Sequence, residues 1–506
     1  MSKKYLLGID IGTYESKGVL INFNGEIVSS HAVPHDLLTP KRGWAEHDAN
    51  EVWWGDFCTI SNSLLDKSNI NSDEIAAIGS SAIAPDVLPV DKNGEPLRNG
   101  ILYGIDTRAD KEIEEMENQL GEAEVLKKSG NKLSSQSVGP KILWLKKNEP
   151  EVYKKTYKFL TATSFIINKL TNNYVIDHYT AAAGFIPFYD INQKKWDIEE
   201  NEDLIKEDQL PKIQWTTETA GYVSKEAALQ TGLEAGTPVI TGTADAAAEA
   251  ISAGVGDPGD TMFMYGSSFF LIGITEKPII DSRIWSAPFL FPDTYCLLGG
   301  MSTTGTLTRW FRDNLAKDLI ENEELAGINA YTNLIKESEN VPAGSEGLIT
   351  LPYFSGERTP INDPLAKGVF FGLSLIHKRA HLFRSILEGV GHGIKNNLDV
   401  LIELGYDPKK LMAVGGGTKN LLWLQIVSDI CARSQNVPEI TIGASYGSAI
   451  LAGLGTGKIE SLEETKTWLK MEDKIIPDQN NHKTYQANHK AFLELYESTK
   501  TLMHRM

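Results

Sequence analysis

Short apolar runs that end in a turn alternate along this chain with longer segments whose apolar residues recur at helical spacing. Near the start, three runs predict strands at Tyr5–Ile9, Gly18–Asn22 and Glu26–Ser30, since the last two flank Asn24-Gly25, a strong hairpin signal. The next segment, Asn50–Lys67, has its large apolar side chains on one helical stripe. The chain is therefore expected to open as strand, glycine turn, strand, turn and strand, followed by an amphipathic helix.

The same alternation continues to the end of the chain. We expect further strands at Ile75–Ser80, Val87–Asp91, Thr237–Thr243, Thr261–Tyr265, Leu348–Pro352, Leu411–Val414 and Glu439–Ile442. We expect helices at Glu112–Lys128, Ala244–Ala253, Ala380–Leu404 and Asn420–Ser434, and a charged helical tail after Gly457. Because strands and helices alternate in both halves, the predicted fold class is α/β.

A strand that ends in a glycine and hydroxyl turn occurs once in each half, at Ile9–Thr13 and at Thr261–Ser268. We interpret this recurrence as a weak internal duplication. With 506 residues, the chain is also too long for one compact core, so two domains are expected. We divide the chain into residues 1–250 and 251–506.

Composition and charge exclude several classes of protein. Lys and Arg number 49 against 67 Asp and Glu, a net charge of −18, which argues against a nucleic-acid partner because such partners need a basic surface. No apolar stretch approaches the ~20 residues of a membrane helix, and Asp10 and Gly12 interrupt the first apolar run, unlike a signal peptide. Three separated cysteines without a CxxC pair favour a reducing compartment. We expect a cytoplasmic protein with no membrane partner.

The first glycine turn carries groups that a nucleotide requires. Asp10 ends a strand, Gly12 and Thr13 form the turn, and Lys17 follows. Glycine frees backbone N–H groups to face phosphate oxygens, lysine supplies a cation, and a carboxylate can hold Mg²⁺ through water. The alternative is an ordinary hairpin turn with an exposed acid, and this segment alone does not decide between them.

Two later turns are further candidates for phosphate or nucleoside binding. Gly266 and Ser267 follow a predicted strand, although the same pattern is common in turns between buried strands. Gly416, Gly417 and Asn420 lie between a strand and a helix, where glycines allow a ring or a phosphate to approach the backbone. The alternative is a tight connection in which Asn420 only caps the helix.

Asp245 follows a predicted buried strand and opens a predicted helix. Aspartate is favoured as a helix N-cap, so capping is one interpretation of this residue. The other is a general base, because ligands of α/β proteins bind at the carboxyl ends of the strands. The sequence around Asp245 leaves both interpretations open.

Taken together, these segments resemble the FGGY carbohydrate kinases over nearly the whole chain. The motifs that carry the resemblance are Gly8-Ile9-Asp10-Ile11-Gly12-Thr13, Gly43-Trp44-Ala45-Glu46-His47-Asp48 with Trp53-Trp54, Pro352–Pro360 with Asn362-Asp363-Pro364, Gly368–Leu373 with His381-Leu382 and Ser385–Gly389, and Gly415-Gly416-Gly417 with Asn420. The second and third of these are similar to the xylulokinase branch of the family.

The resemblance implies two actin-like, ribonuclease-H-like domains with an active-site cleft between them, and ATP-dependent phosphorylation of a terminal hydroxyl of a small sugar. Residues 1–250 would form the sugar side with the first phosphate turn, and residues 251–506 the nucleotide side. The implied roles are a catalytic base for Asp245, a Mg²⁺ carboxylate for Asp10, phosphate or adenosine contacts for Gly12, Thr13, Lys17, Gly266, Ser267, Gly305, Gly416, Gly417 and Asn420, and sugar contacts for Trp44, Asp86, Asp106, Arg108 and Asp245. A homodimer is one alternative for the assembly.

The sequence departs from the family pattern mainly in the sugar pocket. Ala84-Pro85-Asp86 stands where xylulokinases have a histidine, and Ala246 follows Asp245 where an amide is common. D-xylulose is the first candidate substrate, and Asp86 could replace the missing contact. Asp106 and Arg108 could instead form only a surface ion pair.

Two other interpretations remain at this point. The chain could phosphorylate another ketose, a polyol or gluconate. It could also be an actin-like ATPase or polymer protein without a sugar substrate, although such a protein has no need for the Asp245 carboxylate.

Overall fold

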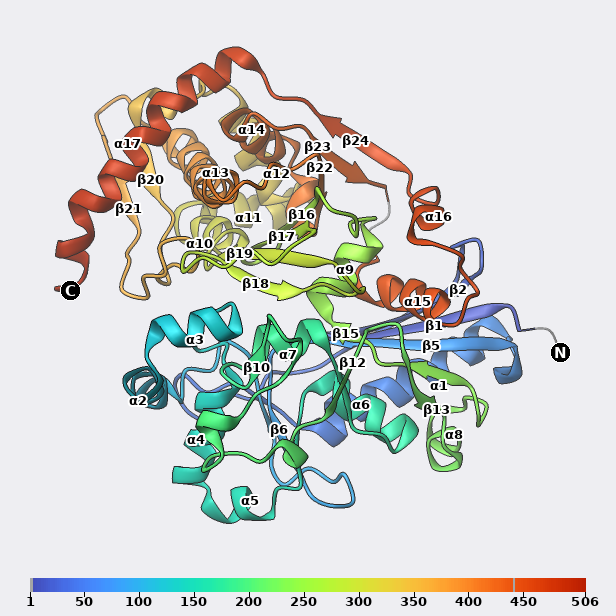
Figure 1. Cartoon of the computed structure of the whole chain (residues 1–506). Helices are drawn as coiled ribbons and strands as arrows, with labels where there is room; N and C mark the ends of the chain where they lie inside the picture. The colour runs from blue at the N-terminus through green and yellow to red at the C-terminus, as the bar shows by residue number, and fades with distance from the viewer. Residues whose placement is uncertain (1–2, 440–441) are drawn as a thin grey trace. The chain divides into compact units, whose positions relative to one another are not determined.

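The computed structural model describes residues 3–439 and 442–506, and contacts divide the chain into two compact units (Figure 1). Unit 1 comprises Met1–Pro258, Ile274–Cys296 and Ile442–Leu469. Unit 2 comprises Gly259–Gly273, Leu297–Thr441 and Lys470–Met506. The units are thus interleaved along the sequence, whereas the division expected from the sequence lies at a single position.

Unit 1 is built on a mixed sheet with the order β13-β14-β5-β1-β2-β3, in which β15 also pairs with β5. Its strands are β1 (Tyr5–Ile11), β2 (Glu15–Asn22), β3 (Ile27–Pro34), β5 (Ile75–Ala82), β13 (Thr219–Tyr222), β14 (Pro238–Ile240) and β15 (Thr243–Ala244). β1 is antiparallel to β2 and parallel to β5. The predicted opening of strand, turn, strand, turn and strand is confirmed.

Unit 1 also contains helices. They are α1 (Gly55–Ser68), α2 (Asp110–Leu120), α3 (Glu122–Ser129), α4 (Val138–Asn148), α5 (Pro150–Lys155), α6 (Ala162–Thr171), α7 (His178–Gly184), α8 (Lys225–Thr231), α9 (Asp245–Ser252), α15 (Ala444–Gly455) and α16 (Leu462–Lys466). Of these, α1, α6, α7, α9 and α15 contact the sheet. The helical stripe predicted in the first half is confirmed, because Trp53, Phe57, Ile60 and Leu64 are all buried. It spans a short π-helix (Ala49–Trp54), capped by Asp48, and α1.

Helix α15 comes from the late part of the chain but belongs to unit 1. It packs against β1, β5 and α9 (Figure 1). Unit 1 therefore contains the strands of the first residues together with a helix that follows them by more than 400 positions.

Unit 2 contains a second mixed sheet, in which β19, β17, β16, β22, β23 and β24 are neighbours in this order. These strands are β16 (Asp260–Tyr265), β17 (Phe269–Thr275), β19 (Tyr295–Met301), β22 (Lys410–Val414), β23 (Gln435–Pro438) and β24 (Met471–Ile475). β16 is antiparallel to β17 and parallel to β22, the same relation as β1 has to β2 and β5. The sheets thus repeat one local arrangement, as the recurring turn predicted.

The helices of unit 2 are α10 (Gly305–Leu315), α11 (Lys317–Ala326), α12 (Ala330–Glu339), α13 (Arg379–Glu403), α14 (Leu421–Cys431) and α17 (Gln479–Met503). A two-stranded sheet of β20 (Ile349–Leu351) and β21 (Val369–Phe371) lies against α13 and α17, where Leu351, Tyr353 and Phe492 form a buried cluster. The helices expected at Ala380–Leu404 and Asn420–Ser434 are present with slightly shifted ends.

Several predicted elements were wrong in detail. The single helix expected at Glu112–Lys128 is two helices, because Gly121 between them has a φ of 79°, a conformation that breaks a helix. The strand expected at Thr237–Thr243 is divided into β14 and β15 by Gly242, whose φ is 73°. The tail after Gly457 is not only helical, because it contains β24.

The strand expected at residues 439–442 lies partly outside the described residues, and the described strand β23 ends at Pro438. None of the described helices is both long enough and apolar enough to cross a membrane.

Candidate active site

The ends of three neighbouring strands bring the candidate carboxylates of unit 1 to one edge of the sheet. Asp10 on β1 is paired with Ser81 on β5, and Thr243 on β15 is paired with the same Ser81. Asp245 lies two residues beyond Thr243 and begins α9. Because β1, β5 and β15 are parallel, their carboxyl ends meet at this edge, where α/β proteins bind ligands.

Asp245 does not cap its helix. The N-cap position is Ala244, which makes no side-chain cap, and the Asp245 carboxylate instead accepts a hydrogen bond of 2.7 Å from the Ala246 N–H. The capping interpretation of Asp245 was therefore wrong. Burial and the negative charge of Asp10 raise the pKa of Asp245 far above that of an ordinary aspartate, which makes it a stronger proton acceptor.

Asp10 is oriented by two serine hydroxyls in series. The Ser81 hydroxyl donates to Asp10 Oδ1 at 2.8 Å, and the Ser448 hydroxyl on α15 donates to Ser81 Oγ at 2.9 Å. Burial raises the pKa of Asp10 to about 6, although the Ser81 bond and the charge of Lys17 oppose this. One carboxylate oxygen is thus held by the protein.

Glu249 is an acidic residue of this site that the sequence analysis missed. It lies one helical turn after Asp245, on the same face of α9, and its carboxylate accepts a hydrogen bond from the N–H of Ala444. Burial and the charge of Asp10 raise the pKa of Glu249 to about 7. Its spacing of four from Asp245, across three alanines, was the signal that could have identified it.

The first glycine turn is a tight hairpin. The Gly12 N–H donates to the Glu15 carbonyl at 3.2 Å, and a Cβ on Gly12 would lie 2.6 Å from that oxygen. The Thr13 hydroxyl lies 3.0 Å from the Tyr103 hydroxyl. Lys17 forms an exposed ion pair with Glu15, with 2.9 Å between Nζ and Oε2. A phosphate would therefore compete with Glu15 for Lys17.

Asp106 and Arg108 form a buried ion pair, not a surface one. Arg108 Nη2 lies 2.7 Å from Asp106 Oδ2, and both side chains are fully buried. Asp106 also accepts a hydrogen bond from the Ala45 N–H, and the Arg108 guanidinium lies 3.9 Å from the centre of the Trp44 ring. Arg108 Nη1 additionally pairs with Glu46 at 2.8 Å. The pair therefore fixes the loop that carries Trp44.

Asp86 is fully buried, and only one of its two carboxylate oxygens has a hydrogen-bond partner in the part of the chain that the structure describes. Its Oδ2 accepts a hydrogen bond from the Ala162 N–H, and its Oδ1 has no hydrogen-bond partner among the described residues. Burial raises the pKa of Asp86 well above its ordinary value, and the charge of Asp245 adds to this. An unpaired buried oxygen is costly unless a ligand group bonds to it.

Lys141 is a second buried residue that the sequence analysis missed. Its ammonium group donates to the carbonyl oxygens of Leu102 and Tyr103 at 2.6 and 3.3 Å. Burial lowers the pKa of Lys141 to about 7, whereas the charges of Asp106 and Asp86 oppose this. Lys141 lies in an ordinary helical pattern, so no sequence signal distinguished it from a surface lysine.

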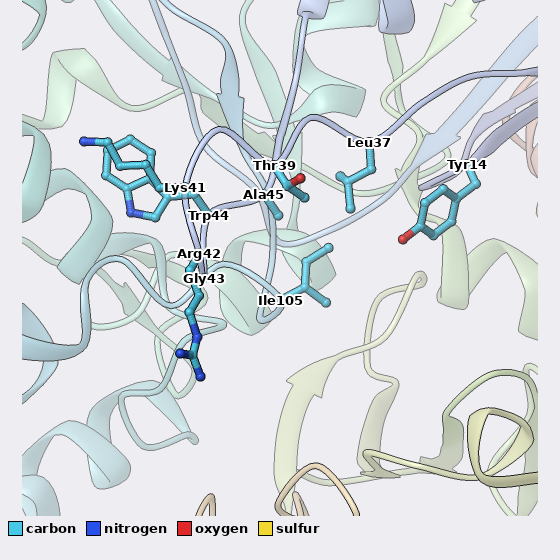
Figure 2. A pocket seen from close by; sticks show the side chains of 9 residues that line it. All are labelled: Tyr14, Leu37, Thr39, Lys41, Arg42, Gly43, Trp44, Ala45 and Ile105. Atoms are coloured by element: carbon cyan, nitrogen blue, oxygen red, sulfur yellow. The ribbon is translucent and has the colours of Figure 1, made fainter. Parts of the chain in front are cut away.

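A pocket of about 450 Å³ opens beside the Trp44 loop (Figure 2). Its lining residues are Tyr14, Leu37, Thr39, Lys41, Arg42, Gly43, Trp44, Ala45 and Ile105. The Lys41 ammonium lies 4.4 Å from the centre of the Trp44 ring, and Figure 2 shows Arg42 extending away from that ring. The charged residues of the lining, Lys41 and Arg42, are both cations.

In unit 2, backbone hydrogen bonds join the glycine turn after β16 to the turn after β19. The Gly305 N–H donates to the Gly266 carbonyl at 3.1 Å, and Thr304 and Thr306 donate to the Ser267 carbonyl. A Cβ on Gly305 would lie 2.5 Å from the Gly266 oxygen, so a side chain does not fit there. The structure thus brings Gly266, Ser267 and Gly305 together at the start of α10.

The third glycine turn lies against the same strand end. β22 is parallel to β16, and a Cβ on Gly417 would lie 2.8 Å from the Cβ of Tyr265. By contrast, no atom lies within 4 Å of the position that a Cβ on Gly416 would take. The Asn420 side chain accepts a hydrogen bond from the Trp423 N–H and caps α14. Its amide nitrogen is not used by this cap.

Two family models match this chain. The N-terminal domain of the FGGY family of carbohydrate kinases matches residues 5–252, and the C-terminal domain of that family matches residues 261–456. A gluconokinase of Bacillus subtilis is 30% identical, over 97% of this chain and 95% of that protein. The chain belongs to the FGGY family of carbohydrate kinases. The family resemblance drawn from the motifs is therefore confirmed.

Other members of this family have the same fold. A xylulose kinase of Staphylococcus xylosus is 27% identical, over 97% of this chain and all of that protein. The crystal structure of a xylulose kinase from Rhodospirillum rubrum has a TM-score of 0.92 at 29% identity, covering 99% of this chain and 100% of that one. The predicted α/β fold with two actin-like, ribonuclease-H-like domains is confirmed, and the chain is a kinase for a small sugar with ATP as the implied phosphoryl donor.

Proposed function

We propose that this kinase transfers the terminal phosphoryl group of ATP to a terminal hydroxyl of a small sugar, with D-xylulose as the first candidate. The observation that carries the proposal is the Asp245 carboxylate, which is partly exposed at the first residue of α9, accepts a hydrogen bond from the Ala246 N–H and has a raised pKa. The xylulose kinases among the relatives favour D-xylulose.

The proposed chemistry needs little from the protein beyond alignment, charge and a proton acceptor. Phosphoryl transfer has a loose transition state, so the attacking hydroxyl needs to be in line but not strongly activated. Asp245 would orient that hydroxyl and accept its proton late in the transfer. The raised pKa of Asp245 suits this task near neutral pH.

The residues fit a magnesium ion at Asp10. Mg²⁺ prefers carboxylate oxygens and keeps most of its waters, and it would neutralise the charge on the transferring phosphate. Ser81 bonds only one oxygen of Asp10, and the other oxygen accepts no hydrogen bond from the described residues. We propose that this second oxygen holds the ion through water.

Backbone groups would hold the nucleotide. We propose that Gly12, Thr13, Lys17, Gly266 and Ser267 contact its phosphates. Gly305, Gly416, Gly417 and Asn420 would contact its adenosine, for which the open space at Gly416 and the spare amide nitrogen of Asn420 provide support. We propose that residues 1–250 provide the sugar side and the first phosphate turn, and that residues 251–506 provide the nucleotide side.

The sugar would bond to Asp86 and stack near Trp44. The unpaired Oδ1 of Asp86 supports a hydroxyl contact there, and the charge of Asp245 acts on the same carboxyl group. Asp106 and Arg108 are engaged with each other and fully buried, so their contribution to sugar binding would be to hold Trp44 in place. We further propose a cytoplasmic enzyme, with a homodimer as one assembly.

Gluconate is the second candidate substrate, and the pocket beside Trp44 favours it. Lys41 and Arg42 line this pocket in a protein of net charge −18, and neither forms an ion pair with an acid in the part of the chain that the structure describes. A carboxylate of a sugar acid would pair with such cations. The gluconokinase relative is consistent with this alternative.

An ADP-release assay across sugars tests both candidates. The panel should include D-xylulose, other ketoses, polyols and D-gluconate, and it should include a reaction without sugar. Phosphorylation of D-xylulose with the highest kcat/KM supports the first candidate. A preference for gluconate that Lys41→Met and Arg42→Met together abolish supports the second, and ADP release that needs no sugar would overturn both.

A further inference from the structure

Helix α15 is in backbone contact with the elements that carry the candidate carboxylates. At Gly8 on β1 and Gly79 on β5, an added Cβ would lie 2.0 and 2.1 Å from carbonyl oxygens of α15. At Gly447 on α15, an added Cβ would lie 1.8 Å from a carbonyl oxygen of α9. Such distances leave room for no side chain, so α15 has a fixed position against β1, β5 and α9.

One polar side chain of α15 reaches the Asp10 carboxylate through another. Ser448 is buried and donates its hydroxyl proton to Ser81 Oγ at 2.9 Å. Ser81 is buried as well and donates to Asp10 Oδ1 at 2.8 Å. A hydroxyl has one proton to donate, so the bond from Ser448 directs the proton of Ser81 toward Asp10.

We propose that Ser448 is a positioning residue for Asp10, which acts through Ser81. This inference rests on the proposed role of Asp10 as the carboxylate that holds Mg²⁺ with the nucleotide. The hydrogen bond to Oδ1 fixes the rotation of the carboxyl group and leaves Oδ2 directed away from Ser81. A residue near the end of the chain thereby sets the geometry of a residue near its start.

The inference predicts a specific effect on metal-dependent binding. Without the Ser448 hydroxyl, the Ser81 hydroxyl can rotate to other acceptors, and the Asp10 carboxyl group is no longer held in one orientation. Groups that orient a metal ligand typically contribute about 10- to 100-fold to metal affinity. Binding of ADP without metal should not depend on Ser448, because no part of the proposed adenosine site contacts it.

Calorimetric titration of ADP into Ser448→Ala, with and without Mg²⁺, is the direct test. We expect affinity for ADP to fall about tenfold with Mg²⁺ and to stay unchanged without it, the low end for a group that orients a metal ligand. Ser448→Thr, which keeps the hydroxyl, should restore most of this loss. The matched control is Ser445→Ala, which removes a buried hydroxyl of the same helix that has no hydrogen-bond partner among the described residues.

A double substitution separates a relay from a general effect on the fold. If Ser448 acts only through Ser81, then Ser448→Ala has no further effect in a Ser81→Ala background. The inference would be overturned if Ser448→Ala lowered ADP affinity with Mg²⁺ equally in the wild-type and Ser81→Ala backgrounds. It would also be overturned if Ser445→Ala lowered this affinity as much as Ser448→Ala does. Unchanged affinity of Ser448→Ala for ADP with Mg²⁺ would overturn it as well.

Asp10→Asn distinguishes failure of this inference from failure of the proposed function. If Asp10→Asn abolishes the Mg²⁺ dependence of ADP binding and Ser448→Ala does not weaken it, only the role of Ser448 is wrong. If Asp10→Asn itself leaves ADP binding with Mg²⁺ unchanged, the metal role of Asp10 is wrong, and the inference fails with it.

Discussion

The two units of this kinase present different chemistry at equivalent strand ends. In unit 1, the ends of β1 and β15 lead to Asp10, Asp245 and Glu249, whose pKa values are raised by burial, and the charge of Asp10 raises the other two further. In unit 2, the ends of β16, β19 and β22 carry glycines and hydroxyl residues, and backbone hydrogen bonds join the turns after β16 and β19. The same local arrangement of strands thus presents carboxylate side chains in unit 1 and mainly backbone groups in unit 2.

This difference teaches that substitutions should fail in different ways in the two units. A side-chain site can lose its function and keep its fold, because an isosteric residue fills the same space. A packed glycine of a backbone site, such as Gly305, has no side chain to remove, so a substitution there adds atoms to a close contact. We expect substitutions in unit 1 to act on rate and pH dependence, and substitutions in unit 2 to act on stability and nucleotide binding together.

The largest effect is expected from Asp245→Asn. Asparagine fills the same volume but accepts no proton, so kcat should fall by at least ~10²-fold while thermal unfolding and ADP binding stay unchanged. Steady-state kinetics with the preferred sugar, thermal unfolding followed by circular dichroism and calorimetric titration of ADP measure these three quantities. A variant with a kcat near that of the wild type would show that Asp245 is not the base.

The next effect is expected from Gly305→Ala in unit 2. The new Cβ would lie 2.5 Å from the Gly266 carbonyl oxygen, a backbone atom that cannot move cheaply. Forced contacts of this kind cost about 1–3 kcal/mol. We expect a lower midpoint of thermal unfolding and a higher KM for ATP. Gly416→Ala is the matched control, since its Cβ would enter open space, and it should leave the unfolding midpoint unchanged.

A smaller effect is expected from Asp86→Ala in unit 1. If its unpaired Oδ1 accepts a sugar hydroxyl, removing it should raise the KM for the sugar about tenfold and lower kcat much less. The KM for ATP should not change. Equal kinetics of Asp86→Ala and the wild type with an efficiently used sugar would exclude this contact.

The smallest effect is expected from Glu249→Gln. The charge of Glu249 raises the pKa of Asp245, and Asp245 must be ionised to accept a proton. Removing that charge lowers the pKa of Asp245. The acid limb of the kcat/KM profile should therefore shift to lower pH, by less than about one pH unit. Glu226→Gln, on the exposed start of α8, changes the net charge equally and should leave the pH profile unmoved.

What the sequence could predict depended on how local each feature is. Asp10, Asp245 and the glycine turns lie at strand ends, so their positions follow from the hydrophobic pattern of a few neighbouring residues. Glu249 was within reach of the same reasoning, because a spacing of four places it on the face of Asp245. A polar residue on a short alanine-rich helix is usually exposed. The sequence does not reveal that α15 packs against α9, the helix that carries Glu249.

Features that depend on tertiary packing could not be predicted. The contact of Ser448 with Ser81 joins residues 367 positions apart and depends on the position of α15. Burial of Asp106 and Arg108 depends on the Trp44 loop folding over them, and a short Asp-x-Arg segment by itself is typical of a surface turn. The break between α2 and α3 was a local feature, but one glycine in a helical pattern is often tolerated.

The interleaving of unit 1 has a practical consequence for dissecting the protein into pieces. A fragment cut after α9 would keep β1, β5 and the candidate carboxylates but would lack α15, which covers Gly8 and Gly79. Those strands would then present a bare apolar face, so such a fragment should aggregate or misfold. A fragment that joins Ile442–Leu469 to the N-terminal segment would restore α15 to its place on β1 and β5. It should therefore be more soluble than a fragment cut between the two family matches, although unit 1 also includes Ile274–Cys296.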